Sequence, residues 1–85
     1  MLDRLEARIT MPEGAAPLAS YARYYARHVR GEIVGTYLRI GNEVPGRRWV
    51  SLEELPQVAD GGCDVITVIA DVRGTVRSAA CNGEA

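Results

Sequence analysis

Two cysteines and one histidine are the side chains of this sequence with the most distinctive chemistry. Cys63 and Cys81 lie far apart in the sequence, and His28 is the single histidine. A catalytic Cys–His pair would also need an orienting group such as Asp60, and the spacing gives no support for one. Zinc sites normally show short Cys-x-x-Cys pairs with further histidines. We therefore expect no catalytic residue, no metal site and no cofactor.

The last third of the chain predicts a β-hairpin. Residues 64–72 and 75–82 consist mostly of β-branched or small residues. A three-residue loop, Val72-Arg73-Gly74, puts glycine where a left-handed residue is needed, as in a type I turn followed by a bulge. One face of this hairpin is the more apolar, and we expect it to face the core: Ile66, Val68, Ala70, Val72, Val76 and Ala80.

The register of this hairpin decides whether the cysteines can be crosslinked. With the three-residue loop, Val65 faces Cys81, and Cys63 lies diagonally on the same face, near the upper limit for a disulfide. A two-residue loop would put Cys81 opposite Ile66 and would point the two cysteines to opposite faces. A Cys63–Cys81 disulfide and two free thiols both remain open.

Residues 17–30 predict the main helix. Pro17 suits a first helical turn, and Gly31 suits a left-handed C-cap. The apolar positions recur at the spacing of one helical face: Leu18, Tyr21, Ala22, Tyr25, Ala26 and Val29.

The remaining segments predict short strands. Residues 5–11 alternate between apolar and polar side chains, which favours a strand, although Leu2, Leu5 and Ile9 would also fit a short helix. Further strands are expected over 32–40 and 47–52. Ser51 and Glu54 have the spacing of a capping box, but Pro56 limits any helix there to about one turn.

This element order resembles the cystatin family. It predicts an α+β fold, with one N-terminal helix packed on a curved four- or five-stranded antiparallel sheet, in a single domain over residues 1–85. The inhibitory Gln-x-Val-x-Gly motif is broken in Gln57-Val58-Ala59-Asp60-Gly61, so protease inhibition is not expected. The chain is also similar to small bacterial proteins of unknown function, in the segments YARYYA (21–26), DGGC (60–63) and CNG (81–83).

Charge and hydropathy limit the expected partners. The net charge of −1 gives no electrostatic reason to expect nucleic-acid binding. No apolar run approaches the ~18 residues of a membrane helix, so no membrane partner is expected. The first ten residues lack the apolar core of a signal peptide, which predicts a cytoplasmic protein. A disulfide between Cys63 and Cys81 would instead favour the periplasm.

The functional hypothesis comes from surplus apolar surface. A single helix covers only one face of the predicted sheet, and exposed apolar patches usually mark interaction sites. We expect a non-enzymatic interaction or structural module that forms a homodimer. The alternative is a small-ligand-binding protein or enzyme whose pocket forms between chains. The expected interface residues are Val65, Ile69, Ala79, Trp49 and Tyr37.

Overall fold

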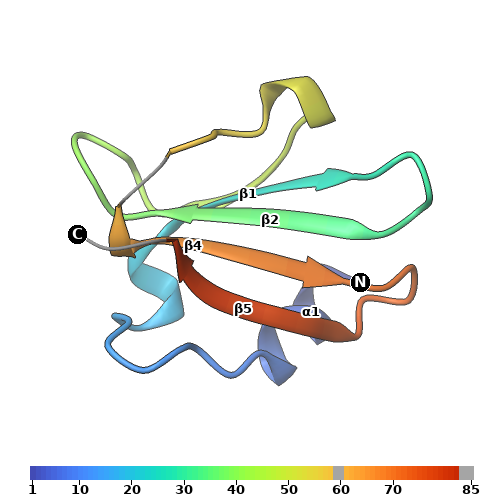
Figure 1. Cartoon of the computed structure of the whole chain (residues 1–85), viewed down its shortest axis with the longest axis horizontal. Coiled ribbons are helices and arrows are strands. Elements are labelled where there is room, and N and C mark those ends of the chain that lie inside the picture. The colour runs from blue at the N-terminus through green and yellow to red at the C-terminus, as the bar shows by residue number, and fades with distance from the viewer. Residues whose placement is uncertain (59–60, 83–85) are drawn as a thin grey trace.

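The computed structural model describes residues 1–58 and 61–82, which form a five-stranded sheet with one short helix (Figure 1). Helix α1 spans Leu2–Arg8, and single 3-10 turns lie at Leu18–Ser20 (η1) and Leu52–Glu54 (η2). The strands are β1 (Ala22–Arg27), β2 (Ile33–Leu38), β3 (Gly46–Trp49), β4 (Gly62–Ala70) and β5 (Val76–Asn82). None of the helices in these residues has the length and apolar character to cross a membrane.

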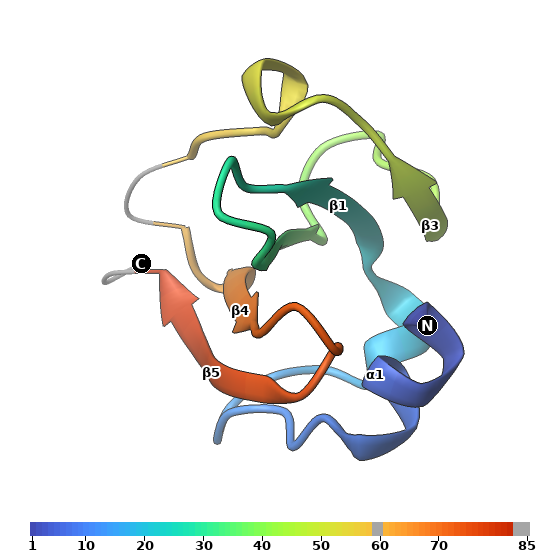
Figure 2. The same cartoon turned by 90° about the vertical axis from the view of Figure 1, so that its right-hand side faces the viewer.

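The sheet is mixed, so the expected antiparallel fold class is wrong. The strand order is β3-β1-β2-β4-β5. β1 pairs in parallel with β3, whereas the β1–β2, β2–β4 and β4–β5 pairs are antiparallel. The parallel pair arises because the segment after β2 crosses to the far side of β1 before β3 begins (Figure 2).

The expected helix over 17–30 is also wrong, because most of that range is strand β1 and the turn after it. Tyr21 and Tyr25 point to one face of the sheet, Ala22 and Ala26 to the other, and all four are buried. When both faces of a strand are buried, apolar residues occur in adjacent pairs rather than in alternation. The pairs 21–22 and 25–26 lie four residues apart, which is also the spacing of apolar residues along one face of a helix. Val29, assigned to that stripe, is 87% exposed.

The N-terminal strand predicted over 5–11 is replaced by helix α1. Leu2 and Leu5 are buried, and Ile9 packs against the same core, so the competing helical interpretation is the correct one. Helix α1 and residues 9–20 cover one face of the sheet, the inner face. Seen end-on, the sheet curls around this N-terminal segment (Figure 2).

The core lies between the inner face and the N-terminal segment. Gly35 lies at its centre, where a Cβ would be in tight contact, 3.1 Å from the Tyr25 ring and 3.3 Å from Val68. The buried members of the core cluster are Leu2, Leu5, Tyr21, Tyr25, Ile33, Tyr37, Ile66, Val68 and Ala70. Three of the residues predicted for the core face of the hairpin are among them.

Both hairpins turn through the same tripeptide. Val29-Arg30-Gly31 connects β1 to β2, and Val72-Arg73-Gly74 connects β4 to β5. In each, the glycine has positive φ, +96° for Gly31 and +86° for Gly74, and its N–H bonds back three residues, at 2.8 and 3.0 Å. The predicted loop over 72–74 is therefore confirmed. The positive φ expected at Gly31 is also found, in a hairpin rather than at a helix end.

Candidate functional site

The structure joins Cys63 and Cys81 in a disulfide, with their Cα atoms 4.5 Å apart. The strand register differs from the expected one, because Cys81 pairs with Ile66 rather than with Val65. In a regular hairpin with this register, the two cysteine side chains would point to opposite faces of the sheet. A bulge removes that obstacle. Gly62 pairs with Asn82, so residues 63–65 of β4 bulge out between two consecutive residues of β5. Within the bulge, Cys63 comes close enough to Cys81 for the two sulfurs to bond.

A second irregularity shifts the register near the turn. Ala70 pairs with Val76, but Ile69 pairs with Ser78, which leaves Arg77 as the extra residue on β5. As a consequence Ala79, rather than Ala80, faces the core. The expected pairing of Val65 with Cys81 is therefore wrong by the one residue that this bulge inserts.

Tyr21 connects the disulfide region to the N-terminal segment. Its hydroxyl donates a 2.5 Å hydrogen bond to the carbonyl of Cys63 and accepts one of 3.1 Å from the N–H of Ala16. The carbonyl oxygen of Glu13 lies 3.5 Å from the Cys63 sulfur. The crosslinked end of the hairpin is thus bound to the segment that covers the inner face.

His28 is remote from the cysteines. It lies in the β1–β2 turn, which adjoins the end of β4 at Ala70, whereas the disulfide lies at the beginning of β4. Its Nδ1 is 3.8 Å from the carboxylate of Glu32. No cluster able to hold a metal ion occurs in the part of the chain that the structure describes. Asp60, considered as an orienting group, lies outside the described residues.

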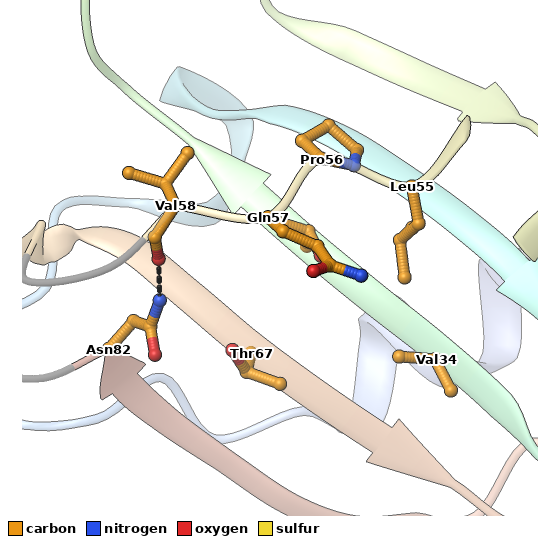
Figure 3. A pocket seen from close by; sticks show the side chains of 8 residues that line it. Val34, Leu55, Pro56, Gln57, Val58, Thr67 and Asn82 are labelled. Atoms are coloured by element: carbon orange, nitrogen blue, oxygen red, sulfur yellow. Dashed lines mark hydrogen bonds between the residues drawn. The ribbon is translucent and has the colours of Figure 1, made fainter. Parts of the chain in front are cut away.

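A groove of about 490 Å³ lies on the outer face of the sheet (Figure 3). Its floor comes from β2 and β4, and one wall is the segment 55–58, which crosses in front of them (Figure 3). The Asn82 amide closes one end by donating a hydrogen bond to the Val58 carbonyl. Every lining side chain is uncharged: Val34, Thr36, Leu55, Pro56, Gln57, Val58, Thr67 and Asn82.

The five predicted interface residues are dispersed. Tyr37 and Val65 have no exposed surface, and Ala79 is half-buried against the core. Ile69 is 38% exposed on the outer face, beside Val34 of the groove. Trp49 is 52% exposed, but it lies on β3, far across the sheet from Ile69. The crossing segment 50–58, which covers part of the outer face, was not anticipated.

A buried polar cluster beneath α1 was also not anticipated. The hydroxyls of Tyr25 and Tyr37 are 2.5 Å apart, and the Tyr25 hydroxyl donates to Glu6 at 2.7 Å. Arg23 forms an ion pair with the same carboxylate at 2.9 Å. Helix α1 thereby supplies the acceptor for groups on β1. No buried side-chain polar atom in the described residues lacks a hydrogen-bond partner.

Burial dominates the acid–base properties of this cluster. It raises the pKa of Tyr37 to about 12, and the nearby Glu6 carboxylate acts in the same direction. Burial also raises the pKa of Tyr25, as does the hydrogen bond that it donates to Glu6. Both phenols are therefore neutral at physiological pH. These groups bond to one another and join α1 to β1 and β2, so the cluster anchors α1 to the sheet.

Comparison with known proteins finds no family model, no curated protein and no solved structure that matches this chain.

Proposed function

We propose that this protein is a non-enzymatic interaction module that self-associates through the outer face of its sheet. The observation that carries the proposal is the uncharged groove of about 490 Å³, continued by Ile69 at its margin. A surface of this kind is suited to binding rather than to acid–base chemistry, because no lining side chain can exchange a proton at neutral pH.

A second copy of the chain suits this face electrostatically. In a twofold dimer the same patch meets itself, so any charge at the centre would face an equal charge. The side chains around the groove avoid that repulsion because all are neutral. Arg77 and Glu32, which line a neighbouring cavity with Ile69, would lie at the rim. Opposite charges at a rim favour correct pairing more than they add affinity.

Equilibrium sedimentation tests the proposal directly. The wild-type chain is expected to be dimeric at about 50 µM, since specific interfaces of standard size usually bind more tightly than that. Ile69→Lys, which puts a charge on the proposed interface, should give monomers. Val72→Lys is the matched control, because Val72 is also exposed (51%) but lies in the turn. A monomeric wild-type protein, or equal effects of the two variants, would refute self-association through this face.

Binding of a small uncharged ligand is the second candidate function. The groove volume lies within the roughly 300–1,000 Å³ of small-molecule sites, and a second copy seated over the groove would enclose it between chains. NMR titration with a library of neutral fragments tests this candidate. Shifts confined to Val34, Thr36 and Thr67 would support it, and their absence would leave the groove as a contact surface only.

The disulfide supports an oxidising compartment for the mature protein, such as the periplasm. Structural disulfides persist there and are rare in the cytosol. Thiol titration of the denatured, unreduced protein isolated from its native cells tests this assignment. Fewer than one free thiol per chain agrees with it, whereas two free thiols would indicate the cytoplasm.

A further inference from the structure

The two Val-Arg-Gly turns lie side by side at one end of the molecule. A Cβ on Gly31 would lie 2.8 Å from the Val72 side chain, so the turns are in contact. Figure 1 shows both at the same end of the sheet, where α1 also begins, and Figure 2 views this end directly. Each turn presents a valine and an arginine, and all four of these side chains are exposed: Val29, Arg30, Val72 and Arg73.

Trp49 and Arg27 extend this end of the molecule. The Arg27 guanidinium lies over the Trp49 ring, 5.9 Å from its centroid, and donates a 2.7 Å hydrogen bond to the Gly31 carbonyl. Trp49 is 52% exposed. We call the resulting combination of apolar and cationic side chains the turn-end surface, and it comprises Arg27, Val29, Arg30, Trp49, Val72 and Arg73.

Nearby acidic side chains neutralise little of this surface. Asp71 accepts hydrogen bonds from the backbone N–H groups of Arg73 and Thr75, at 2.9 and 3.0 Å. Glu32 lies 3.8 Å from His28. The turn-end surface therefore has three arginines against these two carboxylates, although the whole chain has a net charge of −1. Asp3 lines a cavity with Arg73 but is itself paired with Arg47.

We propose that the turn-end surface docks on an anionic lipid bilayer, with the two valines entering the headgroup region and the arginines at the phosphates. Arginine side chains commonly bury their apolar stems while keeping the cation at this depth. Backbone groups in both turns are already hydrogen-bonded: the N–H of His28 bonds to Glu32 at 2.7 Å, and that of Asp71 to Thr75 at 2.9 Å. Entry into the interface thus leaves these groups paired, as a poorly hydrated environment requires. This peripheral contact needs no membrane-spanning helix.

The chemistry favours a bilayer over the other polyanions. Nucleic-acid surfaces combine cations with aromatic stacking. The one aromatic ring here, Trp49, has the Arg27 guanidinium over it, and the valines at the tips of both turns provide neither a stacking face nor a hydrogen-bond donor. A lipid interface uses both parts of each turn, the apolar tip and the adjacent cation. The proposal concerns a surface distinct from the groove, so it does not depend on self-association.

Trp49 is the only tryptophan, so its fluorescence reports on the turn-end surface without a label. The purified oxidised chain is titrated with vesicles of equal parts phosphatidylglycerol and phosphatidylcholine, and separately with pure phosphatidylcholine vesicles. We expect a blue shift with the anionic vesicles only, and its loss as salt is added. No shift with anionic vesicles, or equal shifts with both kinds, would overturn the proposal.

Paired variants identify the contributing side chains. Arg30→Gln with Arg73→Gln should weaken vesicle binding roughly fivefold for each arginine, and Val29→Ser with Val72→Ser should weaken it at unchanged charge.

Arg39→Gln and Val44→Ser are matched controls, since both residues are exposed but lie in or near the loop after β2, at the other end of the sheet. Circular dichroism verifies that each variant is folded. Equal losses of vesicle binding in the controls would contradict lipid docking, as would valine variants that bind as well as wild type. Either outcome would indicate general polyanion binding, which a titration with single-stranded DNA would detect.

Discussion

The hydroxyl groups of Tyr25 and Tyr37 lie 2.5 Å apart beneath helix α1, and neither has exposed surface. Tyr25 donates its one proton to the Glu6 carboxylate, so Tyr37 must donate to the Tyr25 oxygen. The hydrogen bonds consequently run in one direction, from β2 through β1 to α1. This order makes the two tyrosines unequal, although their rings are packed at nearly a right angle, 81°.

Removal of the Tyr25 hydroxyl should cost more stability than removal of the Tyr37 hydroxyl. Tyr25→Phe leaves the Tyr37 hydroxyl buried without a partner and takes a donor from Glu6, which should cost about 2–3 kcal/mol. Tyr37→Phe leaves the Tyr25–Glu6 bond intact and should cost about 1 kcal/mol. Urea denaturation measures both. Tyr24→Phe, which loses only an exposed bond to Glu43, should stay within about 0.5 kcal/mol. The reverse order for Tyr25 and Tyr37 would contradict the proposed direction.

Stability should fall at alkaline pH because of the same pair. An unfolded tyrosine ionises near pH 10, whereas burial raises the pKa of Tyr37 to about 12. Between these values the unfolded chain binds fewer protons than the folded chain, so the free energy of unfolding decreases as pH rises. The contribution of Tyr37 is fully present below pH 10 and is lost by about pH 12.

Urea unfolding at pH 8, 10 and 11.5 measures this decrease, and tyrosinate absorbance measures the ionisation. Tyr37→Phe should reduce the pH dependence and leave the part due to Tyr25, whereas Tyr24→Phe should leave most of it. A stability that is constant through pH 11.5 would show that neither buried phenol couples folding to pH.

The C-terminal hairpin was predictable because its signals are local. The apolar and β-branched composition of 64–72 and 75–82 predicts β4 and β5, and Gly74 supplies the left-handed position of the turn. The capping box of Ser51 and Glu54 is likewise present at η2. Each of these features depends on residues only a few positions apart, so no knowledge of the tertiary structure is needed.

The failures came from tertiary context. Burial on both faces gave β1 a helix-like pattern, and the repeated tripeptide Val-Arg-Gly at 29–31 was the available signal that the segment turns as a hairpin. The bulge at residues 63–65 could not be inferred from period-two patterning, because an inserted residue changes the face without changing the composition. The Glu6–Tyr25 hydrogen bond could not be predicted either, because α1 and β1 come together only in the folded chain.

The Arg23–Glu6 ion pair should contribute more to stability than the exposed pairs. Both side chains are only 11% exposed, and loss of Arg23 leaves the buried Glu6 carboxylate with only the longer, 3.7 Å contact to Arg47. Arg23→Met should cost about 2–4 kcal/mol. Asp64→Asn tests the half-exposed pair with Arg39, 3.4 Å apart, and should cost less than about 1 kcal/mol. Thermal denaturation of both variants measures the contrast. Similar losses would mean that α1 does not depend on the Glu6 anchor.

Gly31 should be the least replaceable turn residue, for two separable reasons. Its φ of +96° is a left-handed conformation that should cost alanine about 1–2 kcal/mol. A new Cβ would also lie 2.8 Å from the Val72 side chain in the neighbouring turn, and such overpacking adds about 1–3 kcal/mol.

Four variants separate the backbone cost from the steric one. Gly31→Ala should carry both, whereas Gly31→Ala combined with Val72→Ala should recover the steric part, measured against Val72→Ala alone. Gly41→Ala carries only the backbone cost, since Gly41 has φ +60° and no neighbour within 4 Å of a new Cβ. Urea denaturation should therefore show a larger loss of stability for Gly31→Ala in the wild-type chain than for Gly31→Ala in the Val72→Ala chain. The loss for Gly31→Ala should also exceed that for Gly41→Ala. If Val72→Ala fails to rescue Gly31→Ala, the two Val-Arg-Gly turns are not in contact in solution, and the turn-end surface loses its second half.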